Sequence, residues 1–261
     1  MILGFNLIGF LILIFPPFLY AWILYLSAPY KSLTLKISFR FIVGGIFSVI
    51  LLSFISFFFP YWNYYYLTDP FIQSFWIVGP KEEISKFLMF LILYKGINKE
   101  QLHHPITYMF YLGMVGLGFS LIENIQYVAK YGFEVLIYRN FGAVFVHMIC
   151  GLLLGYWVGM GKIKKHPNQK SISSNYLNSK PKLKFLLYTI MGLISASTFH
   201  GLWNYHLSIF GVSSKPISIL VLIVGFLSCK LLLRDLTNQY QQSILTTQSL
   251  ESRIDKDLNK I

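Results

Sequence analysis

Four apolar segments of this 261-residue chain carry polar side chains that the hydrocarbon of a membrane should exclude. They are Glu82, Glu83 and Lys86 in one segment, Glu123 and Asn124 in the next, His147 in the third, and His200 and Asn204 in the fourth. An ionisable group inside a span is costly unless it is paired or hydrated, so each position indicates a site. Glutamate and histidine are also the side chains that activate water and bind metal ions. These residues predict a buried hydrolytic centre inside a helix bundle.

The composition is that of a membrane protein. The chain is 55% hydrophobic and only 12% charged, whereas a soluble domain is about 25% charged. A spanning helix needs about 20 mostly apolar residues. Seven such segments are present, at 3–26, 41–59, 75–94, 106–128, 141–161, 185–206 and 217–233. We predict an all-α polytopic membrane helix bundle with about seven transmembrane helices.

The same segments suggest how the chain is divided. We expect a transmembrane bundle over residues 1–234, a catalytic core over about 75–206, and a cytoplasmic C-terminal tail over 235–261. The tail is either an amphipathic helix or a frayed end. The net charge of +12 raises the question of nucleic acid, but the basic residues sit in short loops between spans, so we expect no nucleic-acid partner.

Loop charge predicts the orientation. The fifth loop contains seven lysines and no acid, whereas the second loop has Asp69 and no basic residue. The fourth loop balances Lys130 and Arg139 against Glu134. Because basic loops stay in the cytoplasm, the odd-numbered loops should be cytoplasmic. We therefore expect the N-terminus outside and the C-terminus in the cytoplasm.

This orientation gives the polar residues similar depths. At about 1.5 Å per residue, Glu83, His147 and His200 lie about 18 to 24 Å, and Glu123 about 27 Å, from the cytoplasmic ends of their spans. Spans of alternating direction would thus bring these residues to one layer in the outer half of the bilayer. The alternative is four separate structural polar residues, each satisfied by a neighbouring helix.

The spacing within the first polar segment favours one shared surface. Glu82 and Lys86 are four residues apart and lie on one helical face. Glu82 and Glu83 point about 100° apart, so we expect only one of them to face the centre directly. Gly79 and Pro80 should interrupt the helix and could admit water. A structural ion pair between Glu82 and Lys86 is the simpler alternative.

These motifs together resemble those of the PrsW intramembrane proteases, which share a superfamily with the type II CAAX prenyl endopeptidases. The matching motifs are Glu82-Glu83-Ile84-Ser85-Lys86, then Phe119 to Asn124, then His147 followed at four by Gly151, then His200 followed at four by Asn204. The position of Lys86 and the acidic Glu123 favour the PrsW branch over the CAAX branch. The resemblance covers about residues 75–206.

The resemblance implies an intramembrane endopeptidase of the bacterial cytoplasmic membrane. Its implied substrate is a single-pass membrane protein, such as an anti-sigma factor, cut near the extracytoplasmic side. Glu82, Glu83, His147 and His200 would be catalytic, with Glu123 as a participant. Lys86, Phe119 and Asn124 would support them. The partners expected are this substrate and the lipid bilayer.

Two mechanisms remain open. In the first, His147, His200 and Glu123 hold a zinc ion, and Glu82 or Glu83 acts as general base. In the second, a glutamate activates water without metal while His200 and Asn204 stabilise the oxyanion. The sequence has no HExxH helix, the commonest signature of a zinc protease, and we favour the glutamate route.

Other functions would use the same residue types. A transporter can carry intramembrane carboxylates and histidines, but it more often shows repeats or paired broken helices. A CAAX-type protease, an immunity-like membrane protein or a non-catalytic binding protein would keep the fold with different or lost chemistry. Every motif position is filled here, which favours an active protease.

Overall fold

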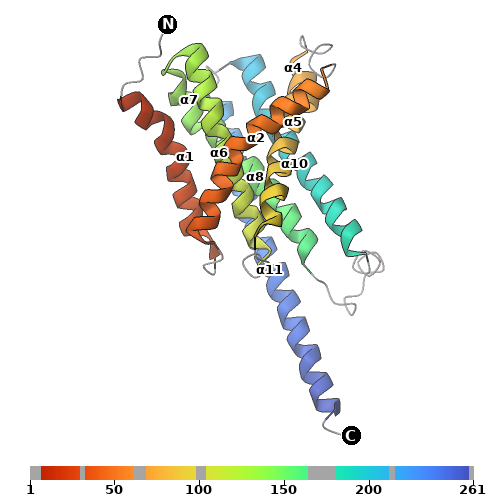
Figure 1. Ribbon diagram of the computed structural model, residues 1–261. Helices are drawn as coiled ribbons and strands as arrows, with labels where there is room; N and C mark the ends of the chain where they lie inside the picture. The colour runs from red at the N-terminus through yellow and green to blue at the C-terminus, as the bar shows by residue number, and fades with distance from the viewer. Residues whose placement is uncertain are drawn as a thin grey trace.

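The chain folds as a bundle of long helices, as the sequence predicts (Figure 1). The computed structural model describes residues 7–29, 33–60, 69–97, 104–163, 180–211 and 215–258, and no strand occurs among them. The long helices are α1 (Leu7–Ser27), α2 (Leu35–Phe58), α5 (Gly79–Lys95), α6 (Ile106–Tyr131), α8 (Ala143–Lys162), α10 (Pro181–Phe210) and α11 (Lys215–Leu258). The short helices are α4 (Pro70–Ile72), the π-helix η2 (Gln73–Val78) and α7 (Val135–Phe141).

Six helical segments in this described part are long and apolar enough to cross a membrane. They correspond to all the predicted spans except 75–94. That segment is also helical, but α5 is only 17 residues long and carries four charged side chains before its last turn, Lys81, Glu82, Glu83 and Lys86. All four are buried in the protein, so the other helices shelter α5 and its charges.

Close packing of small residues fixes α8 against α6. A Cβ atom at Gly116 of α6 would collide with the backbone carbonyl of His147 on α8. A Cβ atom at Gly151 of α8 would likewise collide with the carbonyl of Leu112 on α6. Small residues let membrane helices approach closely, which is their usual role in such interfaces. Gly151, one turn after His147, therefore has a packing role that sets the position of the histidine.

The start of α5 is a widened helix rather than a broken one. The amide of Gly79 donates to the carbonyl of Ser74, five residues earlier, and Gly79 keeps helical dihedrals. Pro80 lies in the first turn of α5, where a missing N–H costs little. The expected interruption at Gly79 and Pro80 is therefore wrong, because these residues begin α5 directly after the π-helix, and the helix continues from Pro70 to Lys95.

The C-terminal tail continues the last span as one helix. At about 1.5 Å per residue, the 44 residues of α11 extend about 66 Å, well beyond the bundle (Figure 1). The hydroxyl of Tyr156 donates to Asp235 Oδ2 at 2.7 Å, and the Tyr240 ring meets His104 edge-on at 4.2 Å. These contacts anchor the point where α11 leaves the bundle. The division into a bundle and a cytoplasmic tail remains a prediction.

Candidate active site

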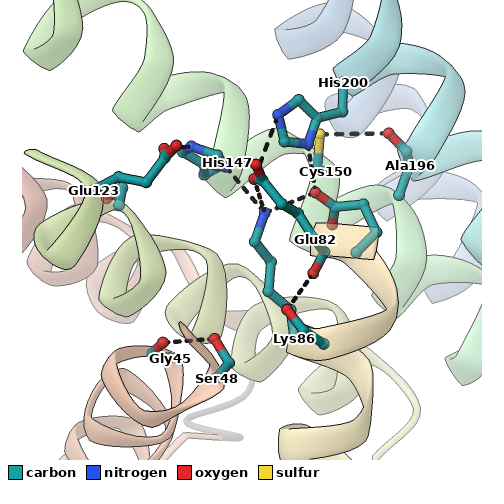
Figure 2. A network of polar contacts seen from close by, with 12 residues as sticks. Gly45, Ser48, Glu82, Lys86, Glu123, His147, Cys150, Ala196 and His200 are labelled. Carbon is teal, nitrogen blue, oxygen red and sulfur yellow. Dashed lines mark hydrogen bonds and ion pairs between the residues drawn. The ribbon is translucent and has the colours of Figure 1, made fainter. Parts of the chain in front are cut away.

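The four helices named by the sequence motifs meet in one buried cluster of polar side chains (Figure 2). Helix α5 contributes Glu82, Glu83 and Lys86 from its first half, and α6 contributes Glu123 near its last turns. Helix α8 contributes His147, and α10 contributes His200. Because consecutive long helices run in opposite directions, the beginnings of α5 and α8 lie beside the ends of α6 and α10. The chain therefore brings these six side chains to the same end of the bundle.

Lys86 lies at the centre of the cluster and is almost fully buried. Its ammonium Nζ donates to Glu83 Oε1 at 2.7 Å and lies 3.8 Å from Glu82 Oε2. It is also 3.0 Å from His147 Nδ1. A single cation thus holds two carboxylates and one imidazole, in contrast to the simple Glu82–Lys86 pair considered from the sequence.

Both glutamates face this centre, so the expectation that only one would do so is wrong. Lys86 is three residues after Glu83 and four after Glu82, and both spacings place side chains on neighbouring parts of a helix surface. The long glutamate side chains cross the remaining angle. The His200 ring contacts both carboxylates. Its Nδ1 atom is 2.8 Å from Glu83 Oε1, and its Nε2 atom is 3.6 Å from Glu82 Oε2.

One carboxylate oxygen of each glutamate is buried without a hydrogen-bond partner in the described part of the chain. Neither Glu82 Oε2 nor Glu83 Oε2 receives a protein donor among the described residues. A buried acceptor of this kind is unfavourable for folding alone. A carboxylate oxygen without a donor has a free lone pair, however, and this lone pair can accept a proton from water or bind a metal ion.

His147 is held from its other side by Glu123. The distance from His147 Nε2 to Glu123 Oε2 is 2.6 Å. Arg139 of α7 donates from Nη2 to the same carboxylate oxygen at 2.9 Å. From the sequence alone, Arg139 is only a charge in the fourth loop. Nothing in its local pattern marks it, because the contact depends on how the short helix α7 folds back onto α6.

The charges of the cluster do not balance. Glu82, Glu83 and Glu123 supply three carboxylates, whereas Lys86 and Arg139 supply two cations. Glu83 is paired with Lys86, and Glu123 with Arg139. Glu82 is therefore the carboxylate whose negative charge is least neutralised by nearby cations. It is the carboxylate best able to accept a proton or to bind a metal ion or a substrate group.

The supporting residues divide into two groups. Phe119 is fully buried, with the Lys86 ammonium 4.2 Å above its ring and the His147 ring 5.2 Å away. Asn124 instead faces Arg139, which donates from Nε to Asn124 Oδ1 at 2.7 Å. Asn204 is half-buried one turn after His200, and the structure records no hydrogen bond from its side chain to the cluster.

The donor set fits a metal ion and keeps the predicted His147 and His200, with Glu82 in place of the predicted Glu123. Glu82, His147 and His200 each offer a ligand atom, and these atoms lie within 4.8 Å of one another. Glu123, predicted as a ligand, lies behind His147 and orients it. A carboxylate on the second nitrogen of a metal-binding histidine is the usual arrangement, and Glu83 gives His200 the same support. The Lys86 ammonium is the group that would compete with a metal.

A second group of possible ligands includes Cys150, which the sequence motifs do not mark as a site residue. Cys150 lies one turn after His147, and its sulfur forms a buried group with Glu83 and His200. The thiol also donates to the Ala196 carbonyl at 3.5 Å. Its position beside His200 could not be read from the sequence, because Cys150 occurs in an uninterrupted apolar stretch.

A helix bundle with a buried centre of glutamates and histidines is the arrangement expected of an intramembrane hydrolase. The comparison with known proteins agrees: a family model described as PrsW family intramembrane metalloprotease matches residues 34–229. The chain belongs to this family, and the peptidase activity expected from the motifs is confirmed at that level. The transporter and non-catalytic alternatives are not supported by this membership.

The curated relatives are similar over most of their length. Protease PrsW of Shouchella clausii is 26% identical over 187 residues, which cover 72% of this chain and 77% of that protein. Protease PrsW of Oceanobacillus iheyensis is 28% identical over 164 residues, covering 61% and 67%. No solved structure matches the chain.

Proposed function

We propose that this peptidase cuts a single-pass membrane protein near its extracytoplasmic side, with Glu82 as the base that activates water. The observation that carries the proposal is the environment of Glu82. Its Oε2 atom is buried and has no hydrogen-bond partner among the residues that the structure describes. It lies 3.6 Å from His200 Nε2 and 3.8 Å from Lys86 Nζ. An anti-sigma factor as substrate rests on the resemblance of the motifs to those of the PrsW family.

The hydrolysis uses groups that the cluster already orients. Glu82 takes a proton from water, and the resulting hydroxide attacks the carbonyl carbon of the scissile peptide bond. The Lys86 ammonium stabilises the negative charge that develops on the carbonyl oxygen. When the C–N bond breaks, the proton held by Glu82 passes to the leaving amine. The products are a carboxylic acid and an amine, and Glu82 is restored.

Glu83 and Glu123 serve the cluster by orienting their partners. Glu83 Oε1 accepts from Lys86 Nζ and from His200 Nδ1, so the lone pair of His200 Nε2 is directed toward Glu82. Glu123 contacts Nε2 of His147, so the lone pair of His147 Nδ1 is directed toward Lys86. A carboxylate that fixes the tautomer and direction of a histidine is a common catalytic arrangement.

The family description names a metal, and the donor set leaves this route open. A divalent ion such as zinc, held by Glu82, His147 and His200, would act as a Lewis acid that polarises water or the scissile carbonyl. The position of Lys86 favours the metal-free route. Lys86 already places a positive charge against this donor set, and its Nζ lies 3.0 Å from His147 Nδ1.

The proposed function is tested by reconstituting the purified protein in liposomes with a set of single-pass membrane proteins. We expect cleavage whose rate changes less than about twofold when a strong chelator is added, because Glu82 can accept the proton without a metal. Mass spectrometry of the fragments should place the cut in the outer half of the substrate span. The Glu82→Gln protein is the inactive control. Loss of cleavage in chelator and its recovery with zinc would instead establish the metal route.

We also propose that the N-terminus lies outside and the C-terminus in the cytoplasm. Figure 1 shows the ends of the described chain at opposite ends of the bundle. Lys182 is exposed in the first turn of α10, at the end of the bundle that the lysine-rich loop would keep in the cytoplasm. Glu134 is exposed just before α7, at the other end. The cluster is nearer the end marked by Glu134.

Cysteine labelling in intact cells tests this orientation. We expect Glu134→Cys to react with a membrane-impermeant thiol reagent and Lys182→Cys to react only after the cells are opened. The native Cys150 and Cys229 are buried, so the parent protein is a suitable background. Labelling of Lys182→Cys alone in intact cells would reverse the orientation and move the site to the cytoplasmic half.

A further inference from the structure

Arg139 makes more contacts with the α6 end of the cluster than a loop charge would. Its Nη2 atom donates to Glu123 Oε2 at 2.9 Å and its Nε atom to Asn124 Oδ1 at 2.7 Å. The guanidinium carbon lies 3.7 Å from the centroid of the Tyr127 ring. Glu123, Asn124 and Tyr127 belong to neighbouring turns of α6, so one planar group engages three of its side chains at once. The Arg139 side chain is only 9% exposed.

The next residue ties α7 to the first helix. Asn140 Oδ1 accepts from Asn124 at 3.0 Å, and Asn140 Nδ2 donates to the backbone carbonyl of Ile12 at 2.9 Å. The Tyr20 hydroxyl donates to the Asn140 carbonyl at 3.1 Å. Ile12 and Tyr20 lie on α1, before the start of the family match at residue 34. The placement of Arg139 therefore depends on a helix outside the matched region.

The hydrogen bonds fix which nitrogen of His147 carries the proton. Glu123 Oε2 accepts a hydrogen bond from Arg139 Nη2 and lies 2.6 Å from His147 Nε2. Because a carboxylate oxygen can only accept, His147 must donate to it from an Nε2–H group. His147 Nδ1 is then the nitrogen with the lone pair, and Lys86 Nζ donates to it at 3.0 Å. Arginine stays charged under all ordinary conditions, so it holds Glu123 as an anion in a fixed direction.

We propose that Arg139 is a positioning residue, which holds Glu123 against His147 and thereby sets the orientation of His147 toward Lys86 and the glutamates. Arg139 does not reach the reacting groups itself. It acts through Glu123, and α1 supports it through Asn140. The effect on cleavage rests on the proposed role of this cluster in the reaction, whereas the effect on His147 does not.

The activity test compares two substitutions at one position with a matched arginine elsewhere. Removing a group that orients a metal-binding histidine typically costs 10- to 100-fold, and by analogy we expect Arg139→Gln to lower kcat by about that factor with little change in KM. Arg139→Lys keeps the charge but cannot make both bonds, and we expect a loss of less than about 10-fold. Arg40→Gln, whose arginine donates to the Gly96 carbonyl at 3.1 Å, should leave kcat unchanged.

A double substitution separates positioning from general structural support. If Arg139 acts through Glu123, then Glu123→Gln combined with Arg139→Gln should be no slower than the slower of the two single variants. Losses that multiply in the double variant would show that Arg139 acts independently, and the proposal would fail. Unchanged kcat in Arg139→Gln would also overturn it.

The protonation of the His147 nitrogens can be measured without any cleavage assay, so it tests the positioning role independently of the proposed function. Nitrogen NMR of the imidazole groups, with His147 assigned by His147→Gln, should show the Nε2–H tautomer in the parent and a mixed or reversed signal in Arg139→Gln. Should Arg139→Gln fail to fold, Arg139→Lys should show an intermediate signal. An unchanged His147 signal in every folded variant contradicts the proposal. If the His147 signal changed in Arg139→Gln but Glu123→Gln remained fully active, Arg139 would still position His147. The contribution of Arg139 and Glu123 to cleavage would then be rejected.

Discussion

Replacing Glu82 by glutamine is expected to lower cleavage by about 1000-fold without destabilising the protein. The amide cannot accept a proton from water, and general-base catalysis is typically worth 10²- to 10⁴-fold. The protein should be as stable as the parent or more stable, since Glu82 Oε2 has no hydrogen-bond partner in the described structure and its charge is the least compensated in the cluster. Cleavage in liposomes and thermal unfolding in detergent measure the two effects.

Two controls make this result specific to Glu82. Glu83→Gln should lower both cleavage and stability, because Glu83 Oε1 is bonded to Lys86 at 2.7 Å and to His200 at 2.8 Å. Glu134→Gln, at an exposed glutamate outside the cluster, should change neither. Near-normal cleavage by Glu82→Gln would remove Glu82 from the reaction and leave Glu83 as the remaining candidate base.

The second large effect is expected from Lys86→Met. Methionine has a similar length but no charge, so the change leaves Glu82 and Glu83 buried side by side without their shared cation. Breaking a buried ion pair by removing one partner typically costs about 3 to 5 kcal/mol in the free energy of unfolding. We expect a destabilisation of about this size, measured by thermal or denaturant unfolding in detergent, together with the loss of nearly all cleavage.

The matched control is Lys130→Met, at an exposed lysine near the end of α6, which should leave both stability and cleavage unchanged. A Lys86→Met protein as stable as the parent would mean that the two carboxylates are neutralised in another way. Addition of zinc to this variant then becomes informative, because the competing ammonium is gone. Restoration of cleavage by zinc in Lys86→Met would show that Lys86 and a metal can occupy equivalent roles.

The sequence by itself determined the class, the helical fold and most of the charged residues that meet in the cluster. Long apolar segments must be helices in a membrane, because their backbone groups have no other partners there. Charged residues within them are expensive, so Glu82, Glu83, Glu123, His147 and His200 stood out before any contact was known. Alternating span directions and a fixed rise per residue then placed them at similar depths. These inferences need only local periodicity and the cost of burying charge.

Only the tertiary structure decided how these residues share their roles. The sequence placed Glu82 and Glu83 on different faces of a helix, but Lys86 and His200 draw both carboxylates to one point. It proposed Glu123 as a metal ligand, whereas the packing of α8 on α6 places Glu123 behind His147.

Arg139 was not distinguishable from an ordinary loop charge until α7 was seen folded back onto α6. The physical reason is the same in each case. Helical periodicity fixes the face from which a side chain leaves, but the partner it meets is set by contacts between helices far apart in the chain. Burial within the membrane then makes those contacts decisive, because each charged group must find a partner in the protein.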